Sequence, residues 1–156
     1  EFILKGKSKK EILISCNICH PSMANNEISG MVVSTELIKF LKKRKNFYTY
    51  RFVFIPETIG SIIYINKNFK KLKSNTVAGF VLTCIGDEKN YSYLESRNTN
   101  TLSDRSTLNF LKFEIKKFKR YSFLQRGSDE RQYCSPNVDL PICSLMKSKY
   151  NTYKEY

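Results

Sequence analysis

Three apolar segments, separated by stretches with helical periodicity, constrain the fold more than any other feature of this chain. They lie at residues 11–16, 50–55 and 80–85. Near-continuous apolar runs of this length are typical of strands buried on both faces, and the stretches between them are long enough for helical crossovers. The pattern predicts a three-layer α/β sandwich with a mainly parallel sheet, in which 12–15, 52–55 and 81–85 are central strands.

Each of these segments is followed by a polar side chain. His20, the only histidine, follows the first, Glu57 follows the second and Asp87 follows the third. Because the carboxyl ends of parallel strands meet at one edge, where α/β proteins bind ligands, we expect these three and Glu27 to converge on one crevice. The alternative is that each acid only stabilises the start of the next helix.

The remaining elements follow from periodicity. Residues 31–45 repeat apolar side chains at helical spacing, and a second helix is expected from about Ser103. A short strand is expected near 91–93, and 140–146 is a candidate last strand. At 156 residues with 41% hydrophobic content, the chain suits a single domain.

Several short motifs occur in a specific order. An Asn-rich turn with Ser-Gly opens a helix at 25–30, Pro-Glu-Thr-Ile-Gly follows a strand at 56–60, and Gly-Asp follows another at 86–87, before Gly-Ser-Asp-Glu at 127–130. This succession resembles the zinc aminopeptidases of metallopeptidase family twenty-eight. More narrowly, segments 18–27, 54–61 and 128–136 are similar to a bacterial branch with an aminopeptidase-like domain of unknown function, often encoded near surface-polysaccharide genes.

The resemblance implies a phosphorylase/hydrolase-like zinc aminopeptidase architecture and roles for individual residues. Glu57 corresponds to the general base, which takes a proton from the attacking water. Asp87 corresponds to a terminal metal ligand. In contrast, Asn17 stands where the family has its first zinc histidine, Asn26 where it has the bridging aspartate, and Thr58 where it has a metal-binding glutamate.

These departures imply at most one zinc ion, with His20, Glu27 and Asp87 as candidate ligands and a fourth partner outside the chain. The family's last histidine would come just after Glu155–Tyr156, and family members are longer, so we interpret the chain as a fragment of a larger polypeptide. We expect the fragment alone to bind zinc weakly and to lack peptidase activity.

The turn at 127–130 is expected to border the same crevice. The resemblance implies that four polar residues line this crevice or bind a substrate in it. They are Asn26, Ser128, Asp129 and Glu130. In the alternative interpretation, Ser128 caps a helix, while the two acids only favour its positive end.

Two functions of different class remain open. One is a zinc-dependent aminopeptidase-like hydrolase of peptide or amide bonds in a small-molecule substrate. The other is a catalytically degenerate aminopeptidase-fold binding module in surface-polysaccharide biosynthesis. The neutral side chains of Asn17, Asn26 and Thr58 favour the second, whereas the retention of His20, Glu57 and Asp87 favours the first.

The formal net charge of +13 invites a nucleic-acid function, but the lysines are scattered over expected helix ends and solvated faces. Zinc-finger spacings, phosphate loops and aromatic RNA-binding signatures do not occur, so we expect no specific nucleic-acid partner.

The five cysteines suit a reducing cytoplasm. Cys16 and Cys19 form a Cys-x-x-Cys, yet in a strand they would face opposite sides. Since no run of 18 apolar residues occurs, we expect no membrane partner.

Overall fold

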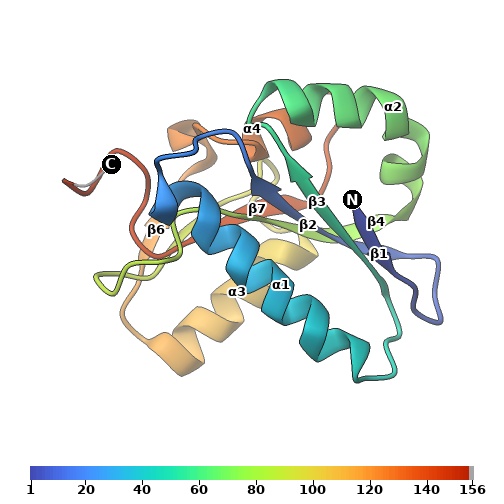
Figure 1. Cartoon of the computed structure of the whole chain (residues 1–156), viewed down its shortest axis with the longest axis horizontal. Coiled ribbons are helices and arrows are strands. Elements are labelled where there is room, and N and C mark those ends of the chain that lie inside the picture. Colours follow the sequence, from blue (N-terminus) through green and yellow to red (C-terminus); the bar gives the residue numbers. More distant parts are fainter. Residues whose placement is uncertain (155–156) are drawn as a thin grey trace.

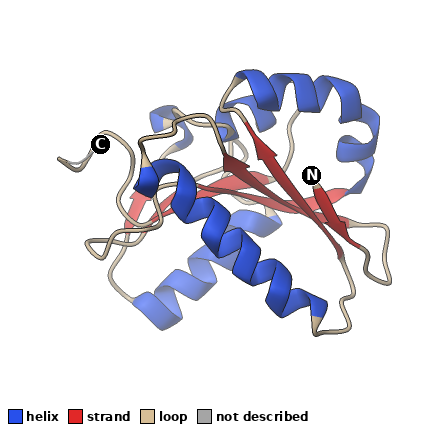
Figure 2. Ribbon diagram, in the orientation of Figure 1, coloured by secondary structure: helices blue, strands red, loops and turns tan. Residues whose placement is uncertain are grey.

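The structure, a computed structural model, describes residues 1–154 and contains one seven-stranded mixed sheet with helices on both faces (Figures 1 and 2). The strands are β1 (Phe2–Leu4), β2 (Glu11–Asn17), β3 (Thr49–Ile55), β4 (Thr76–Leu82), β5 (Ser92–Leu94), β6 (Lys119–Tyr121) and β7 (Ile142–Met146). The helices are α1 (Ser29–Lys42), α2 (Ile59–Asn75), α3 (Leu102–Phe110) and α4 (Glu130–Tyr133), with π-helical turns η1 (Ala24–Ile28) and η2 (Leu111–Ile115) and a 3-10 turn η3 (Phe123–Gln125).

The strand order is β1-β3-β2-β4-β7-β5-β6. Neighbours in the central part, β3, β2, β4 and β7, are parallel, whereas β1 pairs with β3, and β5 with β7, in the antiparallel sense. The predicted three-layer α/β architecture with a mainly parallel sheet is confirmed, and the three apolar segments are its central strands. The loops after β2, β3 and β4 therefore leave the sheet at one edge.

Some predicted boundaries are wrong. The third central strand ends at Leu82 rather than at residue 85. The Thr83 amide still donates to Leu145 of β7 at 3.5 Å, but the Thr83 hydroxyl and the Cys84 amide donate to the carbonyl oxygen of Asn26 in η1, at 2.9 and 3.4 Å. Cys84 adopts a φ of 50°, which turns the chain away from the sheet. The short edge strands β1 and β6 were not expected from the sequence.

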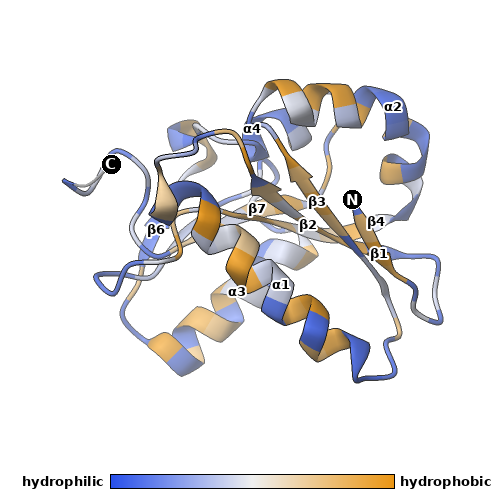
Figure 3. Cartoon of the chain, viewed as in Figure 1, coloured by the Kyte–Doolittle hydropathy of each residue, from blue (hydrophilic) through white to orange (hydrophobic). Residues whose placement is uncertain are grey.

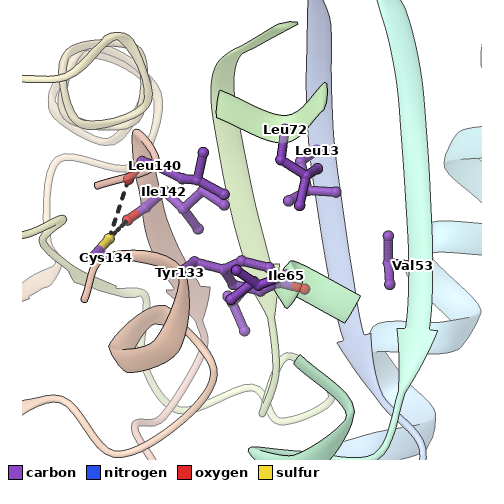
Figure 4. Close-up of a cluster of buried hydrophobic side chains, with 9 residues drawn as sticks. Leu13, Val53, Ile65, Leu72, Tyr133, Cys134, Leu140 and Ile142 are labelled. Carbon is purple, nitrogen blue, oxygen red and sulfur yellow. Dashed lines mark hydrogen bonds between the residues drawn. The ribbon is translucent and has the colours of Figure 1, made fainter. Parts of the chain in front are cut away.

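One face of the sheet packs against α2 and α4. Its core consists of alternate residues of the central strands, with Ile65 and Leu72 from α2 and Tyr133 from α4 (Figure 4). Cys134 donates hydrogen bonds to the carbonyl oxygens of Leu140 and Ile142, at 3.4 and 3.1 Å, and burial raises the pKa of its thiol to about 11. That cysteine is therefore a structural residue.

The opposite face packs against α1 and α3 (Figure 1). Ile14, Phe52 and Leu82 form its buried part with Leu41 of α1. A Cβ added at Gly30 would lie 2.5 Å from the Leu82 carbonyl oxygen, so α1 can begin this close to β4 only because that position lacks a side chain. The central strands are mostly apolar, whereas α1 and α2 carry both polar and apolar residues (Figure 3). Within residues 1–154, the helices are all too short or too polar to span a membrane.

A buried ion pair joins the start of β2 to β3. The Arg51 guanidinium, 1% exposed, donates to both oxygens of Glu11, at 2.6 and 2.8 Å. It also donates to Glu1 at 2.8 Å and to the Tyr64 hydroxyl of α2 at 3.2 Å. The hydrogen bonds with Glu11, the largest influence, raise the pKa of Arg51 further. This pair links the two strands to α2 at the end of the sheet opposite the polar edge.

We expect Arg51→Met to lower the free energy of unfolding by about 3–5 kcal/mol, because it leaves the buried Glu11 carboxylate without its partner. Lys39→Met, which breaks the exposed Lys39–Glu36 pair, is the matched control and should change it by less than about 0.5 kcal/mol. Urea unfolding followed by circular dichroism measures both. Equal effects of the two substitutions would contradict the structural role of the buried pair.

Candidate active site

Glu57 lies directly after β3, and side chains from two other elements hold its carboxylate. The Ser128 hydroxyl donates to Glu57 Oε1 at 2.6 Å, and the Asn17 amide at the end of β2 donates to the same oxygen at 3.2 Å. The Asn17 amide also donates to Ser128 Oγ at 3.2 Å. Because Asn17 and Ser128 are both buried, the direction of the Glu57 carboxylate is fixed.

The alternative in which Ser128 caps a helix is wrong. The residue preceding α4 is Asp129, which makes no side-chain cap, and the Ser128 hydroxyl is directed to Glu57 instead. The Ser128–Glu57 hydrogen bond connects the 127–130 turn to the loop after β3, and contact of this turn with a crevice stays a prediction.

Asp129 is a fully buried carboxyl beside Glu57. Its Oδ1 accepts hydrogen bonds from the Thr58 amide at 2.7 Å and the Ser61 hydroxyl at 2.9 Å, whereas its Oδ2 has no partner within residues 1–154. Burial raises the pKa of Asp129 to about 7 against these two hydrogen bonds, with a further contribution from the charges of Glu57 and Glu130. The group therefore titrates near neutral pH.

The Asp129 bond also holds a strained backbone. Thr58 adopts a φ of 62°, in the left-handed region that β-branched residues rarely occupy, and its amide points at Asp129. Such strain persists only where neighbouring groups enforce it, and it occurs at functional sites. Here it fixes the direction of the chain immediately after Glu57.

Glu130 has a structural role. Its Oε1 accepts from the amides of Gly127 and Ser128 at 2.9 and 3.1 Å and from the Tyr150 hydroxyl at 3.3 Å, while Oε2 accepts from Ser144 at 2.8 Å. The side chain is fully buried. Glu130 therefore organises the turn that presents Ser128 and Asp129.

Cys19, His20 and Glu27 bring three metal-ligating atoms within 4.8 Å of one another, the one such group within residues 1–154. Glu27 Oε1 lies 2.9 Å from His20 Nδ1 and 4.0 Å from Cys19 Sγ, and the latter two atoms are 3.3 Å apart. Glu27 is buried and His20 is exposed. Burial, together with the charges of Glu27, Glu57 and Asp129, raises the pKa of the Cys19 thiol, although a hydrogen bond from the Glu57 amide lowers it.

Asn26 contacts this group through Glu27, whereas Asp87 bonds to other residues, and both side chains are occupied by other hydrogen bonds. Asn26 Oδ1 accepts from Thr83 at 3.0 Å and from Cys84 at 3.1 Å. Asp87 accepts from the amide and hydroxyl of Ser148 at 2.9 and 3.0 Å, and also from Lys89 and Asn25. Burial opposes ionisation of Asp87, but these hydrogen bonds outweigh it and lower the pKa.

Sequence reasoning paired His20 and Glu27 but joined them to Asp87, which is outside the compact group, and it missed Cys19. The Cys-x-x-Cys argument placed Cys19 in a strand, whereas β2 ends at Asn17 and Cys19 lies in the loop. The adjacent Cys19-His20 pair, two residue types that bind zinc, was the signal that could have identified it. The expected histidine after Glu155–Tyr156 concerns a region outside the described residues.

Comparison with known proteins shows the relationships of the chain. Residues 1–156 match the family described as domain of unknown function (DUF4910). The chain belongs to this family. A Clostridium acetobutylicum protein named "polysaccharide biosynthesis protein with aminopeptidase-like domain" is 40% identical over 150 residues, which cover 96% of this chain and 34% of the relative. This DUF4910 chain thus spans about a third of the length of that relative.

Solved structures resemble it as well. A crystal structure of a Clostridium acetobutylicum protein designated a peptidase has a TM-score of 0.93 and 38% identity, and the match covers 97% of this chain and 36% of that one. A zinc aminopeptidase from Bacillus subtilis has a TM-score of 0.76 and 18% identity, covering 96% of this chain and 40% of that one. At such low identity the second match shows the fold alone, which is that of zinc aminopeptidases.

Within residues 1–154, one group of donor atoms in the DUF4910 chain has the chemistry of a zinc site. Zinc takes thiolate sulfur, imidazole nitrogen and carboxylate oxygen, which Cys19, His20 and Glu27 provide. The Asn26 amide is occupied by its own hydrogen bonds, and an amide does not bridge two cations as a carboxylate does. The described residues therefore place one group of candidate zinc donors beside Glu57.

Asp129 predicts an unusual pH dependence of stability. The folded state keeps the Asp129 proton up to about pH 7, whereas the unfolded chain loses it near the ordinary value of 3.8, so ionisation favours unfolding between these two values. Asp129→Asn cannot ionise and keeps the acceptor oxygen. We expect the stability of this variant relative to the wild type to rise between about pH 4 and about pH 8, by at most about 4 kcal/mol.

Urea unfolding across that pH range measures this difference. Glu88→Gln, which removes an exposed carboxylate close to the same edge, is the control and should show a nearly constant difference. A flat profile for Asp129→Asn would contradict a carboxyl that holds its proton near neutral pH.

Proposed function

We propose that the protein carrying this domain is a zinc-dependent hydrolase of peptide or amide bonds in small-molecule substrates, of the metallopeptidase family twenty-eight type, with Glu57 as the general base. The observation that carries the proposal is the fixed Glu57 carboxylate next to the Cys19, His20 and Glu27 group. The fold, which is that of zinc aminopeptidases, supports the same reaction class.

Glu57 meets the requirements of a general base. Ser128 and Asn17 both bond to Oε1, which leaves Oε2 without a hydrogen bond within residues 1–154 and able to accept a proton. The side chain is partly exposed at the carboxyl edge of the sheet, where a substrate has access. General base catalysis needs this combination of a fixed direction and a free lone pair.

The base and the metal-ligating group are directly connected. The Glu57 amide donates a hydrogen bond to Cys19 Sγ at 3.2 Å, so the two parts of the site have a fixed separation. Zinc held by His20 and Glu27 would polarise the scissile carbonyl and lower the pKa of a water. Glu57 then takes the proton of the attacking water and returns it to the leaving amine.

A second function has support from particular side chains. Asn17, Asn26 and Thr58 are neutral at positions where the resemblance implies metal ligands, and hydrogen bonds integrate both amides into the folded structure. The name of the Clostridium acetobutylicum relative includes polysaccharide biosynthesis. The alternative proposal is therefore a catalytically degenerate aminopeptidase-fold binding module in surface-polysaccharide biosynthesis.

Hydrolysis of aminoacyl-anilides by the full-length protein, with its zinc content measured, tests the main proposal. We expect Glu57→Gln to lower kcat by about 10²–10⁴-fold at unchanged zinc content, because the amide cannot take the proton. Glu88→Gln, which removes an exposed acid elsewhere at the same edge, should retain full activity. The domain alone should be inactive.

Two outcomes would contradict the proposal. Full-length activity that survives Glu57→Gln would exclude Glu57 as the base. A zinc-loaded full-length protein that hydrolyses none of these substrates would favour the binding module.

A further inference from the structure

We propose that Cys19 Sγ, His20 Nδ1 and Glu27 Oε1 are the three protein ligands of one thiophilic divalent cation, with Zn²⁺ the best fit, and that Asp87 is not a ligand. The inference deepens the proposed function, on which it rests for the use of the ion. The existence of the cation site itself depends only on the geometry of these three residues.

The distances between the three atoms are close to those of a loaded site. Zinc bonds of about 2.0–2.3 Å in tetrahedral geometry separate neighbouring ligand atoms by about 3.3–3.7 Å. The observed separations are 2.9, 3.3 and 4.0 Å. Changes of about half an ångström, within reach of side-chain rotation at exposed His20, would therefore admit the ion.

Neighbouring groups already orient the ligands. Glu27, 2% exposed, accepts hydrogen bonds from the Cys19 amide at 2.8 Å and from the Asn26 side chain at 3.0 Å. The Glu57 amide donates to Cys19 Sγ. Such outer contacts fix the position of metal ligands and are typical of built metal sites.

The backbone contributes a local irregularity at the same place. Glu27 belongs to the π-helical turn η1, in which the Ser29 amide bonds to the Ala24 carbonyl. The wide turn buries the adjacent side chains of Asn26 and Glu27 together, the first against Thr83 and Cys84 after β4 and the second against the Cys19 loop. Single π-turns inside helices frequently occur at functional sites.

The sulfur ligand determines the class of cation. A thiolate favours zinc and similar ions, whereas magnesium, calcium and manganese prefer sites made of oxygen ligands alone. With three protein ligands, the fourth position remains for a water or a substrate, as in catalytic zinc sites. The Glu57 carboxylate adds negative charge close to Cys19, which favours a cation within a chain of net charge +13.

The hydrogen bonds of Asp87 exclude it as a ligand of the proposed cation. Both of its oxygens accept hydrogen bonds from Ser148, and the Lys89 amide and Asn25 occupy its remaining lone pairs. Binding an ion would require these contacts to break. This difference separates the proposed ligand set from one that contains Asp87.

Metal titration of the full-length Glu57→Gln protein tests the site without turnover. With Co²⁺ as the probe, we expect an ultraviolet thiolate-to-cobalt charge-transfer band that saturates at one equivalent and is displaced by Zn²⁺. Cys19→Ser should abolish the band and weaken binding at least about tenfold, and His20→Ala should weaken binding by a similar factor. Asp87→Asn is the matched control and should leave both unchanged.

A second measurement does not depend on spectroscopy. Among the described cysteines Cys19 is the exposed one, so bound Zn²⁺ should slow its alkylation, as measured by peptide mass spectrometry. Circular dichroism of each variant checks that it is folded.

Cobalt binding without a thiolate band, or binding lost in Asp87→Asn but kept in Cys19→Ser, would overturn the proposed ligands. Failure of the proposed function gives a different result. A wild-type protein that shows the cobalt band but does not hydrolyse the anilides would support the metal site and contradict the hydrolase proposal.

Discussion

The parallel ladder of β3, β2, β4 and β7 is the constraint on which the rest of the structure depends. Parallel neighbours leave their carboxyl ends at one edge, so the loops that carry Cys19, Glu57 and Asp87 begin side by side. The order of these strands in space differs from their order in sequence, which brings residues 40 to 118 positions apart into contact. The hydrogen bonds from Asn17 to Glu57 and from Ser15 to Tyr133 are examples.

The buried carboxyls show how both ends of the sheet are stabilised and where the carboxyl edge is not. Glu11 is neutralised by Arg51, and Glu130 accepts four hydrogen bonds, so each is compensated at both oxygens. Glu27 has partners at both oxygens as well. Asp129 has partners at Oδ1 alone, and its raised pKa is the electrostatic consequence. The least compensated acid thus lies beside the proposed base.

The pKa of Asp129 also shows that the local environment of an acid matters more than the net charge of the chain. A net charge of +13 would by itself favour ionised acids throughout the chain. Asp129 nevertheless holds its proton more tightly than usual, because desolvation acts at short range and the solvated lysines are screened. Ionisation of Asp129 is therefore governed by burial and by neighbouring carboxyls rather than by the overall charge.

The strands and helices could be predicted from the sequence because burial determines the spacing at which apolar residues recur. Leu13 and Ile14 are apolar since adjacent positions of a central strand face two different covered surfaces. The position of Glu57 at the carboxyl end of a central strand was also accessible, since it follows such an apolar run. Its partners were not, because nothing local in the sequence directs the Ser128 hydroxyl across 71 positions to Glu57 Oε1.

The sequence by itself determined the fold class, the three central strands and the edge at which the loops after them leave the sheet, because each follows from local hydrophobic periodicity and chain order. Only the tertiary structure decided that Cys19 rather than Asp87 lies with His20 and Glu27, and that Asp129 is buried with one oxygen unpaired. The physical reason is that side-chain distances and desolvation depend on contacts between loops, and such contacts exist only after the sheet has aligned them.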